Sequence, residues 1–297
     1  TLSPICFFIQ IIQITIGVSL GHGAFGEVFK GSLTVGLFAK PVEVAVKTLK
    51  NGSLNSDDRV TFLREANVML KLRHKNVVRL YGVAAQKEPI MIVMELAPGG
   101  SLLDKVRKDA VSLTQKRYYC FDTINGMQYL ESQQVIHRDL AARNCLIGSN
   151  NLCKISDFGL SLLGHTHQEK SFLKVPIRWL APEVLMKRIY SSKSDVWSCG
   201  VLMFEVFSNG EVPYKDISKL HDVRKEVVFN RLRLKPPSDM PPEDITIMQS
   251  CFEDNPASRP SFDDLRRTYK ELCGARALQK LMGWFSTDTP ELAPVKG

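Results

Sequence analysis

Three glycines, Gly21, Gly23 and Gly26, fit the pattern G-x-G-x-x-G. Glycine lets backbone amides approach anionic oxygens closely, so the pattern favours a phosphate-binding loop. Dinucleotide-binding proteins share the pattern but need a helix that opens at the third glycine, whereas residues 27–31 are typical of a strand. We therefore expect the loop to be the bend of a hairpin. A tight turn that binds no ligand is the alternative.

A lysine follows on a predicted strand at residues 42–47. Alternation along this strand places its three valines on one face and Glu43, Ala45 and Lys47 on the other. The small Ala45 leaves room for a planar base, and the ammonium group of Lys47 could reach the phosphates of that base. A buried ammonium needs an acidic partner, for which Glu65 on the apolar stripe of the next predicted helix is the candidate. The alternative is that Glu65 lies at the surface rim.

A dense polar group lies between two apolar runs at residues 135–147. It has the form His-Arg-Asp-x-x-x-x-Asn, from His137 to Asn144, and Asp-Phe-Gly follows at 157–159. Ala-Pro-Glu comes next, at 181–183. Together with the glycine loop and Val-Ala-Val-Lys upstream, these motifs occur in an order that chance does not explain, and they form the protein-kinase signature set.

The chain resembles the catalytic domain of eukaryotic protein kinases over about residues 14–273. Within that superfamily it is similar to the tyrosine kinases, because Ala-Ala-Arg at 141–143 stands where serine/threonine kinases usually carry a lysine. The segment 175–183 also matches the tyrosine-kinase pattern. Residues 137–144 and 155–161 are most similar to the non-receptor Fes/Fer group.

The resemblance implies ATP and Mg²⁺ and six catalytic residues: Lys47, Glu65, Asp139, Arg143, Asn144 and Asp157. It places Lys47, held by Glu65, on the phosphates, and it assigns Asn144 and Asp157 to the metal. Asp139 would accept or orient the proton of the acceptor hydroxyl, and Arg143 would help to place the phenol.

The same resemblance implies a nucleotide site with contributions from both lobes. Its residues are Leu20, Gly21, His22, Gly23, Gly26, Val28, Ala45, Lys47, Met94, Glu95, Ala97 and Leu146. Glu95 and Ala97 would bond the adenine through their backbone, and Met94 would guard the pocket behind it.

The segment between Asp157 and Glu183 departs from the family pattern because it contains no tyrosine. Family members commonly carry one there, and its phosphate pairs with an arginine that corresponds to Arg138. We therefore expect that autophosphorylation of this segment does not switch the protein. Glu169 is the strongest candidate for a permanent partner of a cation, although the sequence favours a solvated position for it.

Three packing features also follow from the resemblance. Arg259 should form a buried ion pair with Glu183. Phe252 replaces a tryptophan usual in the family and keeps an aromatic side chain there. His137 and Phe158 should act as packing links between the lobes.

Two kinds of pattern divide the chain into the elements that must hold these motifs. Short apolar runs rich in Val and Ile dominate residues 14–96 and predict a small antiparallel sheet with one helix. Helical patterns dominate from Gly99 onward, and residues 195–207 are apolar nearly all round, as in a helix buried on every side. We expect an α+β, bilobal protein kinase-like fold with an N-lobe at 14–96, a mainly helical C-lobe at 97–273 and a tail at 274–297.

Residues 1–13 form an apolar segment of unknown role. The segment is too short for a spanning helix and lacks the basic flank of a signal peptide, so membrane association stays open, with a peripheral mode favoured. The alternation from Ile14 to Leu20 predicts a buried strand. Because the chain starts at Thr1, we expect it to be a fragment or a processed product.

The composition is that of a globular protein, with 297 residues, 44% of them hydrophobic and 24% charged. The seven cysteines form no C-x-x-C pair, which argues against a disulfide framework and favours a reducing, cytoplasmic setting. The net charge is +8, but the basic residues are scattered, so we expect no nucleic-acid binding.

We therefore expect a protein-tyrosine kinase of intracellular signalling that acts on tyrosines of protein substrates, with an SH2 or other flanking domain in a longer chain. The alternative is a pseudokinase that binds nucleotide or partners without turnover, and the segment without tyrosine motivates it. Lys47, Asp139 and Asp157, which pseudokinases usually lose, are all present. Arg143 and Pro176 disfavour serine/threonine specificity.

Overall fold

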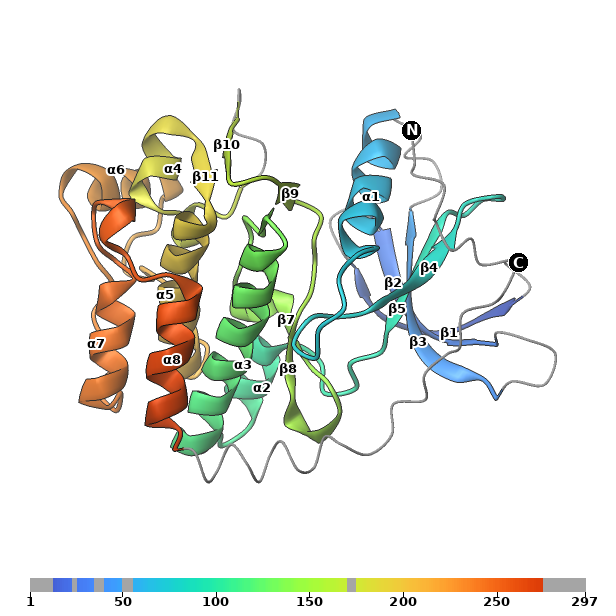
Figure 1. The fold of residues 1–297 in the computed structure, drawn as a ribbon, viewed down its shortest axis with the longest axis horizontal. Helices are drawn as coiled ribbons and strands as arrows, with labels where there is room; N and C mark the ends of the chain where they lie inside the picture. Colours follow the sequence, from blue (N-terminus) through green and yellow to red (C-terminus); the bar gives the residue numbers. More distant parts are fainter. Residues whose placement is uncertain (1–12, 23–25, 35–39, 50–55, 170–174, 275–297) are drawn as a thin grey trace.

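A computed structural model describes residues 13–22, 26–34, 40–49, 56–169 and 175–274. Figure 1 shows a sheet with one helix on the right and a group of helices on the left, so the chain forms two lobes. This is the expected α+β bilobal kinase fold. Apart from Gln13 and Gly274, the apolar segment 1–13 and the tail 274–297 lie outside the described residues.

The N-lobe is an antiparallel sheet with the strand order β1-β2-β3-β5-β4. Its elements are β1 (Ile14–His22), β2 (Gly26–Leu33), β3 (Val42–Leu49), α1 (Ser56–Met69), β4 (Leu80–Ala84) and β5 (Met91–Glu95). The two faces of β3 differ as the alternation predicts, because Val44 and Val46 pack in a small apolar cluster with Val93. The apolar stripe of α1, with Phe62 and Met69, belongs to the main core instead.

The strand β1 forms where the alternation predicts it, but the prediction that it is buried is wrong. Ile16, Val18 and Leu20 are 43%, 68% and 51% exposed. The reason is the position of β1 at the edge of the sheet, where, among the described strands, it pairs with β2 alone. Period-two alternation therefore identified the strand without showing which of its faces is covered.

The C-lobe is mainly helical. Its helices are α2 (Leu102–Lys108), α3 (Leu113–Ser132), α4 (Pro182–Lys187), α5 (Ser192–Phe207), α6 (Leu220–Phe229), α7 (Pro242–Ser250) and α8 (Phe262–Leu272). Its short strands are β6 (Val135–Ile136), β7 (Cys145–Ile147), β8 (Cys153–Ile155), β9 (Leu162–Leu163), β10 (Thr166–Gln168) and β11 (Ile189–Ser191). They form three pairs, β6 with β9, β7 with β8 and β10 with β11.

The helix α5 lies at the centre of this lobe, and every residue from Ser194 to Phe207 is buried. The prediction of a helix buried on every side is confirmed. The six cysteines in the described residues are free, and all except Cys273 are buried. Within the described part of the chain, none of the helices combines the length and the hydropathy needed to cross a bilayer.

Candidate active site

Lys47 and Glu65 connect the sheet to α1. Lys47 Nζ donates to both carboxylate oxygens of Glu65, at 2.8 and 2.6 Å. Their side chains are only 8% and 2% exposed, so the alternative of a surface-rim glutamate is wrong. Burial lowers the pKa of Lys47, but the charges of Glu65 and Asp157 outweigh this effect and raise it, so the ammonium stays charged.

The glycine pattern lies where β1 leads into β2. A strand, not a helix, begins at Gly26, as predicted. The two strands are paired as far as His22 and Glu27. A Cβ at Gly26 would lie 1.7 Å from the carbonyl oxygen of Thr48, so only glycine fits where β2 meets β3. Gly23 lies outside the described residues, and of His22 only the backbone is described.

Six apolar residues of the predicted nucleotide site come from both lobes. Ala45 on β3 is paired with Met94 on β5, and both side chains are buried. The other four are more open: Leu20, Gly21, Val28 and Leu146. Leu146 forms a β-bridge with Ser101, at the start of α2, which brings it to the segment that joins the lobes.

That joining segment holds the two residues predicted to bond the adenine through their backbone. The Glu95 carboxylate binds Lys154 Nζ at 2.9 Å and accepts from the backbone N–H of Arg79. The N–H of Ala97 has no hydrogen-bond partner among the described residues, so this donor is available to a ligand.

Asp139, Arg143 and Asn144 converge in the loop between β6 and β7. Arg143 forms an ion pair with the Asp139 carboxylate, and Asn144 Nδ2 donates to the Asp139 carbonyl oxygen at 2.8 Å. Burial raises the pKa of Asp139 to about 6, against the opposing effects of Arg143 and Asn144, and the charge of Asp157 adds to the rise. A carboxylate with this pKa is ionised at neutral pH and is still basic enough to accept a proton.

Asp157 is exposed and has a positive φ of 61°, a conformation that non-glycine residues rarely adopt. The next residue, Phe158, is buried and packs edge to face on His137 with ring centroids 5.2 Å apart. Burial lowers the pKa of His137 to about 4, so the ring is neutral, and its Nε2 donates to the Ser156 carbonyl oxygen at 3.1 Å. His137 and Phe158, which both belong to the C-lobe, therefore pack on each other. Their role as links between the lobes stays a prediction.

Two acidic residues of α5 bind the backbone of residues 137–144, here called the catalytic loop, and the sequence did not predict this role. Asp195 accepts from the backbone N–H groups of His137 and Arg138, at 2.7 and 2.9 Å. Glu205 accepts from the N–H of Ala142 at 2.9 Å. The available signal was the presence of two acids in a helix that is otherwise apolar on all sides.

Glu205 binds both the catalytic loop and Trp179 through hydrogen bonds. Its Oε2 accepts from Trp179 Nε1 at 3.0 Å, and the guanidinium of Arg143 stacks over the Trp179 ring at 4.4 Å. The side chain of Arg143 is thus held between an aromatic face and the carboxylate of Asp139.

The segment after Asp157 contains a contact that corrects an expectation. Glu169 is not solvated: its carboxylate lies 2.9 Å from Arg138 Nη1 and is 23% exposed. β10, just before it, pairs with β11, which brings the segment to the catalytic loop. Ser161 is buried and donates to the His137 carbonyl oxygen, whereas Thr166 is exposed.

The end of the same segment is fixed by the expected pair of Arg259 and Glu183. Arg259 donates to the two carboxylate oxygens of Glu183 at 2.7 and 2.8 Å, and its side chain is 0% exposed. Phe252 is buried and packs edge to face on Trp197, so the aromatic that replaces the tryptophan fills the core.

The described residues contain no group of three or more histidine, cysteine, aspartate or glutamate side chains that could hold a metal on their own. Asn144 and Asp157 offer oxygen ligands, since the amide nitrogen of Asn144 is used by Asp139 and its oxygen remains. Mg²⁺ is usually held by few protein oxygens together with the phosphates of a substrate. The donor set therefore fits Mg²⁺ bound with a nucleotide.

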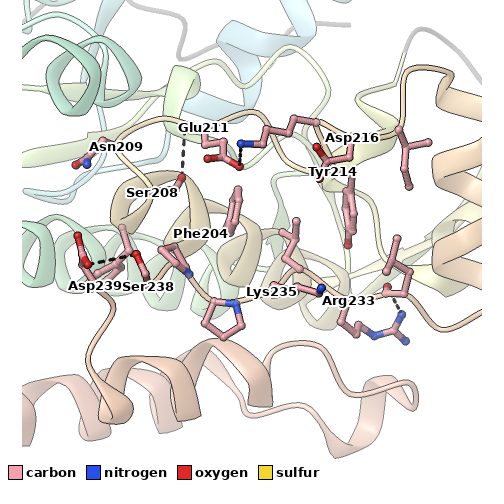
Figure 2. Close-up of a pocket in the computed structure, with 17 residues that line it drawn as sticks. Phe204, Ser208, Asn209, Glu211, Tyr214, Asp216, Arg233, Lys235, Ser238 and Asp239 are labelled. Carbon is pink, nitrogen blue, oxygen red and sulfur yellow. Dashed lines mark hydrogen bonds and ion pairs between the residues drawn. The ribbon is translucent and has the colours of Figure 1, made fainter.

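A separate cavity of about 640 Å³ lies in the C-lobe, lined by the end of α5 and by residues 208–217 and 232–239. Figure 2 shows Glu211 on its wall with a dashed line from its carboxylate. This carboxylate forms an ion pair with Lys215 at 3.1 Å. The cavity is lined by none of the catalytic or nucleotide-binding residues that the sequence predicts. The candidate active site is therefore the group around Lys47 and Asp139.

Comparisons with known proteins agree with this site. A family model described as protein tyrosine and serine/threonine kinase matches residues 14–269. Spermatocyte protein spe-8 of Caenorhabditis elegans is 42% identical over 270 residues, which cover 90% of this chain and 53% of that protein. Tyrosine-protein kinase Fer of Mus musculus is 43% identical over 259 residues, which cover 86% of this chain and 30% of that protein.

The tyrosine-protein kinase transforming protein Fps of avian sarcoma virus (strain PRCII) is 42% identical over 255 residues, covering 84% of this chain and 46% of that protein. The chain thus spans about half, or less, of the length of these curated relatives.

Proposed function

Because this chain belongs to the protein tyrosine and serine/threonine kinase family and is similar to Fes/Fer-type tyrosine kinases, we propose that it transfers the γ-phosphoryl group of ATP to tyrosine hydroxyls of protein substrates. The observation that carries the proposal is the group of Lys47, Glu65, Asp139 and Asp157. The charge of Asp157 acts on each of the other three, so the four residues lie around one site.

The N-lobe residues of this site bind the nucleotide. Lys47, kept charged and oriented by Glu65, donates to its phosphates, and the backbone of the β1–β2 hairpin approaches them from the other side. Mg²⁺, when bound, neutralises charge on the phosphates, and Asn144 and Asp157 would hold it.

The C-lobe residues act on the acceptor. A tyrosine hydroxyl has a pKa near 10 and is protonated before transfer, so it needs a nearby proton acceptor. Asp139 orients this hydroxyl and takes its proton as the new O–P bond forms and the bond to ADP breaks. Arg143, stacked on Trp179, helps to place the phenol beside Asp139.

A pseudokinase is the second candidate, and no observation favours it. Its motivation was the segment without tyrosine, but Glu169 supplies a carboxylate to Arg138 in that segment. The charged groups of the reaction are present, and Lys47 contacts Glu65 while Arg143 contacts Asp139.

We also propose the cellular setting and the domain division that the sequence implies. The kinase domain covers residues 14–273, with lobes at 14–96 and 97–273. The protein acts on protein substrates in cytoplasmic signalling, as part of a longer chain with an SH2 or other flanking domain. The length of the relatives supports the flanking domain, since the matched parts cover only 30–53% of them.

The test is a phosphotransfer assay on a poly-Glu-Tyr peptide with Mg-ATP. We expect the wild type to label tyrosine and Asp139→Asn to lose nearly all activity, because the variant cannot accept a proton. Asp109→Asn removes a carboxylate from an exposed ion pair with Lys105 and is the matched control. A wild type that binds ATP but does not label the peptide would support the pseudokinase instead.

A further inference from the structure

Arg138 lies between His137 and Asp139, and both its backbone and its side chain make close contacts. Its backbone N–H binds Asp195, its guanidinium stacks on the ring of Tyr190 at 4.0 Å, and its Nη1 donates to the carbonyl oxygen of Leu160 at 3.2 Å. The side chain is only 5% exposed, and its Nε has no partner among the described residues. The guanidinium charge is therefore buried and needs compensation.

Glu169 provides that compensation. Within the described part of the chain it is the only carboxylate in ion-pair contact with the Arg138 side chain, at 2.9 Å. The same carboxylate faces His167, whose Nε2 lies 3.5 Å away. A pair this enclosed is much stronger than an exposed one, and breaking it leaves a buried charge alone.

The position of Arg138 determines that of the residue beside it. Arg138 has a positive φ of 69°, a conformation that costs free energy and persists only where contacts enforce it. Asp139 follows directly in the chain, and its own N–H donates to His137 Nδ1 at 3.3 Å. A shift of the Arg138 side chain toward solvent would release this turn and move the Asp139 carboxylate.

We propose that Glu169 is a positioning residue for phosphoryl transfer: a permanent carboxylate that locks Arg138, and through it the catalytic loop, without any modification of the segment. This inference rests on the proposed kinase function. It concerns the acceptor side of the site, since Glu169 contacts none of the described residues that are proposed to bind ATP.

The experiment compares Glu169→Gln, Glu169→Asp and the wild type in the same peptide assay. We expect Glu169→Gln to lower kcat by about tenfold or more while the KM for ATP stays within about twofold, and Glu169→Asp to restore part of kcat. Glu211→Gln, which breaks an exposed ion pair far from the site, should behave as the wild type. Melting temperatures show whether each variant is folded.

A double-variant test separates positioning from general destabilisation. If Glu169 acts through Arg138, then Arg138→Met combined with Glu169→Gln should be no slower than Arg138→Met alone. A Glu169→Gln enzyme with unchanged kcat, or additive losses in the double variant, would overturn the inference while the wild type remained an active kinase. An inactive wild type would instead reject the proposed function.

Discussion

The Asp139 carboxylate has an unusual pKa for a reason that can be tested. Burial raises this pKa to about 6, and the group accepts a proton only when ionised. We therefore expect kcat to fall as the pH drops through about 6. Arg143 lowers the pKa of Asp139, so Arg143→Met should move the acidic limb of the pH profile of kcat to higher pH. A limb that stays in place would show that another group titrates.

Lys47 is tested by a substitution that keeps its shape. Lys47→Met retains the aliphatic stem and removes the charge that faces the phosphates, so we expect phosphotransfer to be abolished and the fold to persist. Peptide labelling measures the first effect and the melting temperature the second. Activity within about tenfold of the wild type would correspond to only ~1.4 kcal/mol, too little for the proposed role.

The pair that the sequence predicted best is Lys47 with Glu65, because a buried ammonium needs an acid and Glu65 lies on the apolar stripe of the next helix. Trp179, Asp195 and Glu205 were missed as supports because each acts on a loop far away in the chain. Periodicity identifies the helix that carries Asp195 and Glu205 but not what those acids face. Only the packed structure brings donor and acceptor together.

At the scale of elements, the chain around Glu183 is fixed by a single buried arginine. Arg259→Ala would leave the Glu183 carboxylate, 14% exposed, without its two donors, and we expect a loss of ~3–5 kcal/mol in the free energy of unfolding. Denaturant unfolding measures this loss. Arg267→Ala on α8, an exposed pair with Asp264, should change it by less than about 1 kcal/mol. Equal effects of the two substitutions would contradict a special role for Arg259.

Two elements also show what alternation and loop composition cannot predict. The strand β1 was expected to be buried, but an edge strand needs a covering layer, and its alternate residues are exposed instead. Glu169 was expected in solvent because it lies in a loop, where ion pairs are usually exposed and weak. The β10–β11 pair, which the sequence does not indicate, brings it to Arg138.

At the scale of the whole molecule, the absence of a tyrosine between residues 157 and 183 predicts how activity responds to phosphate. Ser161 is buried and hydrogen-bonded, and Arg138 already has a carboxylate partner. We therefore expect that preincubation with ATP does not raise the rate and that a tyrosine phosphatase does not lower it. Rates before and after each treatment test this expectation.

Activation by ATP would contradict this expectation. If preincubation raised the rate by about tenfold and mass spectrometry placed the phosphate on a tyrosine outside the segment, such as the partly exposed Tyr118, the switch would lie elsewhere. The contact of Glu169 with Arg138 would then not suffice for full activity.

The buried, free cysteines allow the opening of the C-lobe to be followed by thiol alkylation. Burial raises the pKa values of the Cys120 and Cys199 thiols well above the usual range for cysteine, and it raises the pKa of Cys251 to about 12. These thiols therefore react only after the helices around them separate. Cys145 and Cys153, on neighbouring strands beside the catalytic loop, sample a different layer. The order in which alkylated peptides accumulate in mild denaturant would therefore show whether the helices or the catalytic strands open first.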